Sequence, residues 1–276
     1  MIIEIVGRPR TGKTALNTLF LLREQVYCGQ FLRERSAQLI TEFNKLREAG
    51  EKQLSIPDKS PIYANYKAQI RIGYKEVFEP YLLNPYRLGV PTPQLADKLQ
   101  YMLPFSRLHV TEGRKYWDGR ESSSMPDNVS QFFETHGHNY MTIIIDAQRG
   151  KALDLNIREN ANRFIEVQYM RKYKDAYGRI IHCTWYCREF YSLQDYDAYI
   201  TGKSSFYSRE TKFEYAGNIF DCFESRNRQT DYIPKGNNNY STLEFVDANE
   251  LNRLPCYLRE MYDPARPEWF RVKNAA

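Results

Sequence analysis

Gly7-Arg8-Pro9-Arg10-Thr11-Gly12-Lys13-Thr14 is the stretch that decides the expected fold of this 276-residue chain. It fits the pattern G-x-x-x-x-G-K-[ST] at every specified position, which is typical of a phosphate-binding loop, or P-loop. In such a loop the glycines permit a tight turn, and successive backbone N–H groups point into one concavity that binds phosphate oxygens. Lys13 is expected to reach the β- and γ-phosphates, and the Thr14 hydroxyl to ligate Mg²⁺. The motif therefore predicts binding of ATP with Mg²⁺.

The segments on either side of this loop supply the context that a P-loop requires. Residues 2 to 6 are an apolar run interrupted only by Glu4, which predicts a buried parallel strand. Residues 13 to 27 place their apolar side chains on one helical face. These side chains are Ala15, Leu19, Leu22 and Val26. The positive N-terminal end of that helix would then face the same phosphates.

A second strand is expected to end in a carboxylate, because a P-loop ATPase needs one to hold Mg²⁺ and to act on the attacking water. Residues 108–111 (Leu-His-Val-Thr) lead to Glu112, and residues 143–145 (Ile-Ile-Ile) lead to Asp146. On pattern alone the second is the better strand. Gln148 follows Asp146 by two residues and is a candidate sensor of the γ-phosphate, with an ordinary surface amide as the alternative.

Composition places the chain among ordinary globular proteins. With 42% hydrophobic and 26% charged residues, it can bury a core without disulfides. The net charge of +5 permits a nucleic-acid partner without requiring one. The five cysteines are scattered and show no zinc-site spacing. No signal peptide or transmembrane segment is visible, so we expect a cytoplasmic protein, in the host cytosol if a phage encodes it.

Apolar periodicity and turn residues divide the rest of the chain. Helices are predicted at 30–49, 94–102 and 128–135, strands at 62–66, 108–110 and 140–146, and a β-hairpin at 164–186. Beyond residue 190 the sequence is aromatic and polar. We expect a P-loop domain at 1–226, with a helical insertion at about 30–57, and a partly irregular C-terminal extension at 227–276. The expected class is α/β: a P-loop NTPase three-layer sandwich with a mainly parallel sheet and an antiparallel hairpin.

Four segments, taken in order, carry a resemblance to a known family. They are GRPRTGKT at 7–14, VTEGRKYWDGR at 110–120, THGHNYMTIIIDAQR at 135–149 and LNIRENANRFIEVQ at 155–168. In this order they resemble the ATPase domain of the zonular occludens toxin (Zot) family, which includes filamentous-phage assembly proteins and belongs with the FtsK/HerA-like P-loop ATPases. The resemblance covers roughly residues 1 to 170 and continues more weakly to about 226.

The resemblance implies roles for the residues that follow the two strands. Family proteins carry an Asp-Glu pair at the end of the catalytic strand, and here Thr111 and Glu112 hold that place. Glu112 would act on the attacking water, Thr111 would hold Mg²⁺ through a water molecule, and Gln148 would be the sensor. Asp146 would lie on the sensor strand. A threonine brings no negative charge, which leaves open whether Asp146 compensates.

An arginine from a neighbouring subunit often reaches the γ-phosphate in ring-forming ATPases. The resemblance implies a homo-oligomeric ring and places Arg158 and Arg163 where such an arginine finger would lie, with Arg149 a weaker candidate. The alternative for each is a solvated or salt-bridged arginine.

DNA, or a DNA–protein complex, is the expected macromolecular partner. Two segments interleave cationic and aromatic side chains, as single-stranded nucleic-acid surfaces do. They are Arg114-Lys115-Tyr116-Trp117 with Arg120, and Arg171-Lys172-Tyr173-Lys174. The alternative for each is a solvated charged loop. Phage assembly proteins of this family usually carry a transmembrane segment, so a separate membrane or virion partner is also expected.

Together these features predict an ATP-binding motor of a phage or mobile element, acting in DNA translocation, packaging or virion assembly and export. Thr111 at the aspartate position motivates an alternative from another class, a nucleotide-gated scaffold that hydrolyses ATP slowly or not at all. A small-molecule kinase is a third hypothesis. It is the weakest, because residues 171–190 predict two regular strands and not an arginine-rich lid.

Overall fold

The computed structural model describes residues 1–46, 56, 60–68, 70–72, 75–78, 80–82, 105–120, 125, 127–223, 243–245 and 270–272. The chain divides into two units, Met1–Asn227 and Arg228–Ala276. In the second unit the described residues form two short parallel strands, β11 (Leu243–Phe245) and β12 (Phe270–Val272). The helix predicted at 94–102 lies outside the described residues.

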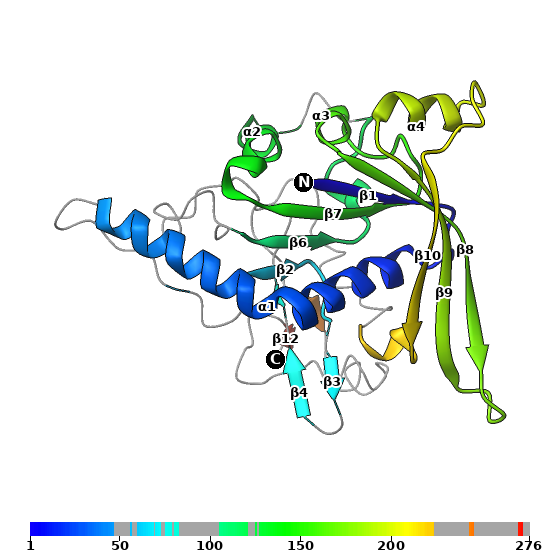
Figure 1. Ribbon diagram of the computed structural model, residues 1–276, viewed down its shortest axis with the longest axis horizontal. Coiled ribbons are helices and arrows are strands. Elements are labelled where there is room, and N and C mark those ends of the chain that lie inside the picture. The colour runs from blue at the N-terminus through cyan, green and yellow to red at the C-terminus, as the bar shows by residue number, and fades with distance from the viewer. Residues whose placement is uncertain are drawn as a thin grey trace. The chain divides into compact units, whose positions relative to one another are not determined.

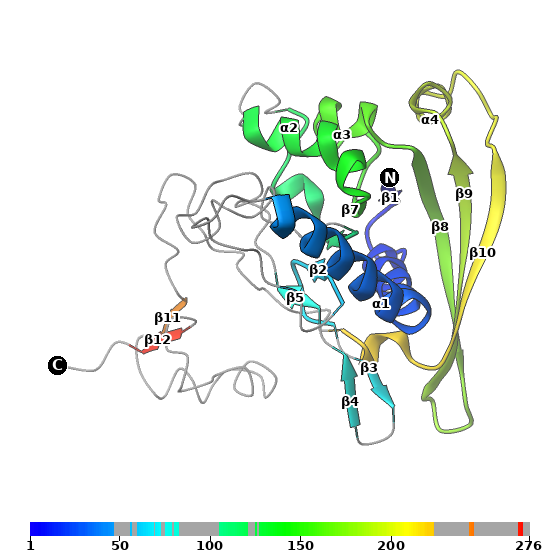
Figure 2. The same ribbon diagram turned by 60° about the vertical axis from the view of Figure 1, so that its left-hand side comes forward.

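An eight-stranded sheet forms the centre of the first unit, in the order β10-β9-β8-β1-β7-β6-β2-β5 (Figure 1). Its strands are β1 (Ile2–Val6), β2 (Ile62–Ala64), β5 (Tyr81–Leu82), β6 (Arg107–Val110), β7 (Thr142–Ala147), β8 (Arg163–Lys174), β9 (Ile180–Phe190) and β10 (Arg209–Ala216). Neighbours from β5 to β8 are parallel, whereas β9 is antiparallel to both β8 and β10 (Figure 2). The predicted α/β class, with a mainly parallel sheet and an antiparallel hairpin, is confirmed. A separate short hairpin joins β3 (Ile70–Ile72) to β4 (Lys75–Phe78).

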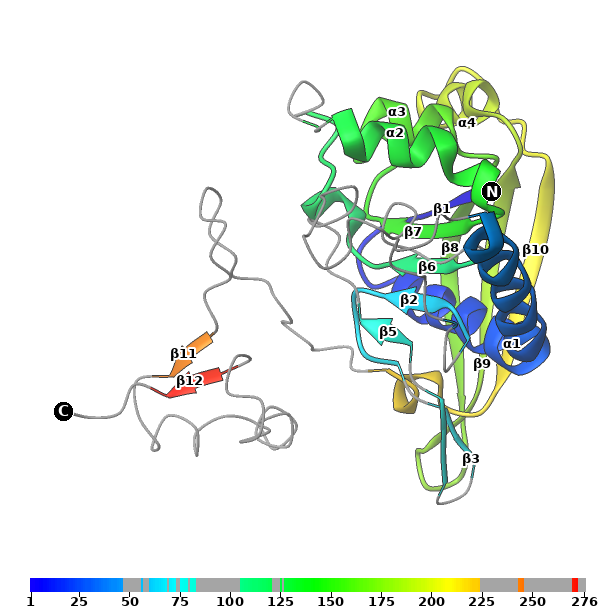
Figure 3. The same cartoon turned by 90° about the vertical axis from the view of Figure 1, so that its left-hand side faces the viewer.

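Helices cover both faces of the sheet (Figures 1 and 3). One face packs against α1 (Lys13–Leu46), and the other against α2 (Asp127–Thr135), α3 (Leu155–Glu159) and α4 (Leu193–Ile200). Successive side chains of a strand point to opposite faces, so Ile3 and Ile5 join the core beneath α1, while Ile2 and Val6 join the opposite core. The central strand β1 is therefore buried on both faces, which explains its apolar sequence.

The P-loop helix α1 is one continuous helix of 34 residues, whereas the sequence predicted two helices at 13–27 and 30–49. Gly29 does not end it, because a glycine within a helix costs only about 1 kcal/mol relative to alanine. This glycine instead allows close packing. The Ser60 hydroxyl donates to the Gly29 carbonyl at 2.7 Å, and a Cβ at Gly29 would lie 2.9 Å from that hydroxyl. Among the described residues, no helix is both long enough and apolar enough to cross a bilayer.

Two elements after residue 190, α4 and β10, were not predicted. The Ser192 hydroxyl caps α4 by accepting a hydrogen bond from the Asp195 backbone N–H at 3.0 Å, and this Ser-x-x-Asp pattern is an N-terminal helix signal in the sequence. In β10 the alternate residue Phe213 is buried, and its ring packs edge-on against Phe20 of α1 with centroids 5.1 Å apart. Both elements therefore have local signals, although weak ones.

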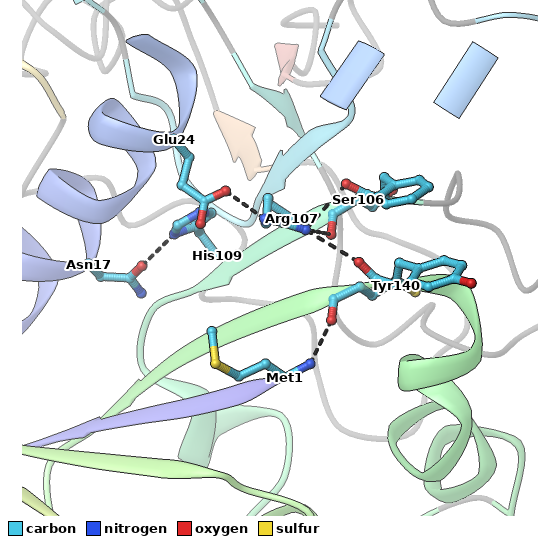
Figure 4. Close-up of polar contacts among 9 residues, drawn as sticks. Met1, Asn17, Glu24, Ser106, Arg107, His109 and Tyr140 are labelled. Carbon is cyan, nitrogen blue, oxygen red and sulfur yellow. Dashed lines mark hydrogen bonds and ion pairs between the residues drawn. The ribbon is translucent and has the colours of Figure 1, made fainter. Parts of the chain in front are cut away.

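Polar contacts join α1 to β6 in the core beneath α1, and Figure 4 shows some of them. The Asn17 amide donates to the Val110 carbonyl at 3.0 Å, and its oxygen lies 2.8 Å from His109 Nδ1. Burial lowers the pKa of His109 to about 3, so its ring is neutral and Nδ1–H donates to Asn17. At the start of β6, Arg107 Nε donates a hydrogen bond to the Glu24 carboxylate at 2.6 Å. These contacts fix the P-loop helix against the strand that leads to the predicted catalytic residue.

Candidate nucleotide-binding site

The P-loop joins the end of β1 to the start of α1 and turns sharply at its two glycines. Gly7 has φ 152° and Gly12 has φ 89°, conformations that L side chains rarely adopt. Space is equally restrictive, because a Cβ would lie 2.7 Å from the Val167 carbonyl oxygen at Gly7 and 2.5 Å from Met170 Sδ at Gly12. Both glycines that the motif specifies are thus required by the backbone. A turn of this kind at a helix N-terminus is suited to hold an anion.

Lys13, the first residue of α1, is 8% exposed and donates from Nζ to the Arg8 carbonyl at 2.9 Å. Burial lowers its pKa, and the nearby carboxylates of Asp146 and Glu112 act in the opposite direction. The ammonium is therefore held by one neutral carbonyl and has unused donor capacity. The exposed Arg8 and Arg10 side chains add cationic groups to the same loop.

Asp146, near the end of β7, lies directly beside the P-loop helix. Its carboxylate accepts a hydrogen bond from the Thr14 hydroxyl at 3.2 Å and another from the Glu112 backbone N–H at 2.9 Å. The side chain is 1% exposed, and burial raises its pKa to about 6. Asp146 therefore connects the P-loop helix to the segment that follows β6.

Glu112, two residues after β6, is exposed and adopts a left-handed conformation with φ 53° and ψ 46°. Such a conformation in a residue other than glycine costs on the order of 1–2 kcal/mol and often marks a functional site. The next residue must be small, because a Cβ at Gly113 would lie 2.3 Å from Ile145 Cγ2. The Glu112 backbone is thus fixed by Asp146 on one side and by the close approach of Gly113 to β7 on the other.

Thr111 makes its polar contacts with Asn65, the residue after β2. Its N–H donates to Asn65 Oδ1 at 2.9 Å, its hydroxyl lies 3.4 Å from the same oxygen, and its carbonyl accepts from Asn65 Nδ2 at 3.0 Å. These contacts lie on the β2 side of β6, whereas β7 and β1 lie on the other side. Within the described residues, Thr111 makes no hydrogen bond to the P-loop.

Gln148 follows β7 directly and is exposed at the edge of the sheet where the P-loop lies, and the exposed Arg149 comes next. Sequence reasoning missed two residues beneath the loop, Trp185 and Met170. Trp185 Nε1 donates to the Gly12 carbonyl at 2.9 Å, and Met170 Sδ fills the space beside the same glycine. Both come from the β8–β9 hairpin, more than 150 residues along the chain, so no local sequence signal predicts this contact.

The chain is similar to solved structures at low sequence identity. One is the N-terminal domain of zonular occludens toxin from Neisseria meningitidis, at 18% identity and TM-score 0.42, covering 81% of this chain and 98% of that one. Another is the genome packaging NTPase B204 from Sulfolobus turreted icosahedral virus 2 in complex with AMPPCP, at 12% identity and TM-score 0.36, covering 70% of this chain and 97% of that one.

No protein-family model matches the chain. No curated protein matches it either. The first of the two solved structures belongs to the family that the sequence resembles, and the second is a viral packaging enzyme. At these identities and TM-scores the likeness is too distant to transfer a function.

Arg158, predicted as an arginine finger, is buried at 5% exposure and forms an ion pair with Asp197 of α4. Its other charged neighbour is Glu4 on β1, which is 1% exposed and has no hydrogen-bond partner for either carboxyl oxygen among the described residues. Arg163 likewise pairs with Glu189 at 2.8 Å. In this conformation the geometry of both arginines favours the alternative, a structural ion pair.

The two segments predicted to contact DNA differ in exposure. In the first, Trp117 is 5% exposed and packs edge-on against Phe133 with centroids 5.0 Å apart, so its ring cannot stack on a base. In the hairpin, Tyr169 and Tyr173 are exposed, and the Arg171 guanidinium lies 5.5 Å from the Tyr169 ring centroid. The hairpin segment presents exposed cationic and aromatic groups together, whereas the Trp117 ring of the first segment is buried.

The oxygen donors beside the P-loop suit a Mg²⁺–nucleotide complex. Mg²⁺ prefers hard oxygen ligands and usually keeps several waters, taking one or two protein carboxylates together with substrate phosphates. The Thr14 hydroxyl and the Asp146 carboxylate, 3.2 Å apart, are donors of this type. In the described part of the chain, no three His, Cys, Asp or Glu side chains gather into a site for a resident metal. The Thr14 hydroxyl and the Asp146 carboxylate therefore fit a cation that arrives with a nucleotide.

Proposed function

We propose that the chain is an ATP-hydrolysing P-loop motor of a phage or mobile element, which moves DNA or a DNA–protein complex during translocation, packaging or virion assembly and export. One observation carries the nucleotide-binding part of this proposal. The P-loop runs from a buried parallel strand to a helix N-terminus, with the buried Lys13 ammonium beneath it and the Asp146 and Glu112 carboxylates nearby. The motor part follows from the resemblance in the sequence.

The P-loop backbone is proposed to bind the phosphates. The backbone N–H groups of the loop, which Pro9 lacks, and the α1 dipole would face the phosphate oxygens. Lys13 would exchange the Arg8 carbonyl for a β- or γ-phosphate oxygen, which is a stronger, charge-assisted hydrogen bond. The Thr14 hydroxyl would ligate Mg²⁺. A bound Mg²⁺ would neutralise charge on the phosphates.

Hydrolysis requires a base and a group that orients water. Glu112 is proposed to accept a proton from the attacking water as its oxygen bonds to the γ-phosphorus. The bond from that phosphorus to the bridging oxygen breaks, and ADP leaves with the electron pair. Gln148, exposed at the end of β7, is proposed to orient the water. The exposed position of both side chains at the same sheet edge as the P-loop supports these roles.

The proposal includes a homo-oligomeric ring, in which a neighbouring subunit completes the site, and DNA as the transported polymer. The exposed tyrosines and arginine of the β8–β9 hairpin support the DNA contact, since aromatic and cationic groups together suit a nucleic acid strand. Arg158 serves as a finger only if its ion pair with Asp197 opens in the assembly. A separate membrane or virion partner remains part of the proposal.

One observation favours the alternative of a nucleotide-gated scaffold. Thr111 stands where an aspartate is usual, and its polar groups are directed to Asn65. A site without a carboxylate at this position would bind nucleotide and hydrolyse it slowly.

Steady-state ATP turnover distinguishes the two functions. The purified chain is assayed with Mg²⁺, alone and with single- or double-stranded DNA, beside Lys13→Ala and Glu112→Gln. Lys45→Ala and Glu159→Gln serve as matched controls, because both residues are exposed and lie away from the P-loop. The motor proposal expects DNA-stimulated turnover that both site variants abolish and both controls retain. Nucleotide binding without turnover under any condition would replace it with the scaffold.

A further inference from the structure

The parallel register brings position 146 of β7 level with position 111 after β6. Val110 pairs with Ile145, so the next residues along the two strands, Thr111 and Asp146, come side by side at the carboxyl edge of the sheet. Strand β7 lies between β6 and β1, and Asp146 itself pairs with Ile5 of β1. Asp146 is therefore one strand closer to the P-loop strand than Thr111.

The hydrogen bonds of Asp146 and Thr111 also place Asp146, and not Thr111, against the P-loop helix. Asp146 Oδ2 lies 3.2 Å from the hydroxyl of Thr14, the motif residue that ligates Mg²⁺. Thr111 is instead held from the opposite side by Asn65, through both its N–H and its hydroxyl. Of the two side chains, only Asp146 has a negative charge, and within the described residues only Asp146 makes a hydrogen bond to the P-loop helix.

The environment of Asp146 lacks a compensating cation in direct contact. The side chain is 1% exposed, and within the described residues its carboxylate has no ion pair, only the Thr14 and Glu112 hydrogen bonds. Burying a carboxylate without a directly paired cation is unfavourable. A divalent cation beside Thr14 would supply the missing positive charge, and a carboxylate is a ligand that Mg²⁺ prefers.

We infer that Asp146 holds Mg²⁺ beside Thr14, directly or through a bound water, and so replaces on β7 the aspartate that position 111 of β6 lacks. This inference rests on the proposed ATP binding. The metal-binding carboxylate has moved sideways by one strand of the parallel sheet, while Glu112 stays at the end of the original strand. Because Asp146 also accepts the Glu112 backbone N–H, cation binding and the position of the proposed base are linked through one side chain.

The test measures the gain in nucleotide affinity that Mg²⁺ provides, with no need for turnover. A non-hydrolysable ATP analogue is titrated calorimetrically against the full chain in Mg²⁺ and again in EDTA. The inference expects Asp146→Asn to keep the affinity measured in EDTA and to lose the Mg²⁺-dependent gain, by at least about tenfold. Thr111→Ala is expected to retain that gain. The double variant Thr111→Asp/Asp146→Asn, which returns the carboxylate to β6, is expected to recover part of it.

A spectroscopic readout uses Mn²⁺ in place of Mg²⁺. With Mn²⁺ and the analogue already mixed, adding the wild-type chain is expected to diminish the remaining EPR signal of free Mn²⁺ further, and adding Asp146→Asn is expected to leave that signal close to its level without protein. Retention of the metal-dependent gain in Asp146→Asn, or its loss in Thr111→Ala, would overturn the inference while leaving ATP binding intact. A wild-type chain that binds no analogue under either condition overturns the proposed function as well. If Asp146→Asn does not fold, as thermal melting would show, the result for Thr111→Ala decides.

Discussion

Glu4 makes the stability of the fold depend on pH. It lies in the centre of β1, and burial raises the pKa of its carboxyl to about 8, with the Arg158 charge acting in the opposite direction. In the unfolded chain the pKa returns to the ordinary 4.5. A group whose pKa is higher in the folded state stabilises the fold most at low pH, and this stability is lost as the pH rises from 4.5 to 8.

The size of this effect follows from the two pKa values. Each pKa unit corresponds to about 1.4 kcal/mol, so raising the pH from 4.5 to 7 should remove on the order of 3 kcal/mol of unfolding free energy. The measurement is urea unfolding at several pH values between 5 and 8. Glu4→Gln removes the titrating group without a large change in volume, and Glu159→Gln at an exposed position is the control.

We expect the difference in unfolding free energy between Glu4→Gln and the wild type to change by this amount across the range, in favour of the variant at high pH. The control should follow the wild type throughout. Parallel curves for the wild type and Glu4→Gln would refute the reasoning, because they would mean that Glu4 has the same pKa in the folded and unfolded states.

Three further changes test other parts of the structure. Gly113→Ala should displace Glu112 and reduce ATP turnover more than ATP binding, because its Cβ would lie 2.3 Å from a β7 side chain; unchanged turnover would contradict the described backbone. Trp185→Phe removes the hydrogen bond to the Gly12 carbonyl, so the free energy of unfolding measured by thermal unfolding should fall by about 1 kcal/mol. Calorimetry should also show weaker ATP binding, and unchanged binding would contradict the support of the loop by Trp185. Arg158→Met removes the buried member of the ion pair with Asp197, whose side chain is 32% exposed, and should lower the free energy of unfolding in urea by on the order of 1 kcal/mol. If the Arg158→Met protein is stable and binds ATP without turnover, the result would instead support the role of Arg158 as an arginine finger.

The sequence predicted the central part of the fold well, because each strand there is marked by a short apolar run in the local sequence. The runs at 2–6, apolar except for Glu4, and at 143–145 are buried on both faces, and the motif glycines at 7 and 12 have backbone conformations that glycine permits. The helix that follows was placed correctly at its start but divided in two. The helix continues through Gly29, because the packing of this glycine against Ser60 offsets its low helix propensity.

The parts that the sequence did not predict depend on contacts between distant segments. The choice between Glu112 and Asp146 remained open because strand order decides which carboxylate lies beside Thr14, and a single sequence does not give strand order. The support of Gly12 by Trp185 joins residues far apart in the chain. Arg158 resembled a finger in its motif, but its burial against α4 depends on a helix that was not predicted.

The central claim is that residues 7 to 14 bind the phosphates of ATP, and calorimetric titration of the wild-type chain with Mg²⁺–ATP tests it most directly. We predict one ATP per chain, with an affinity that falls about 10- to 100-fold in Lys13→Ala, the equivalent of one charge-assisted hydrogen bond. Lys45→Ala, on the exposed end of the same helix, should bind as the wild type does. No measurable binding by the wild type, or equal affinity in Lys13→Ala, would contradict the claim.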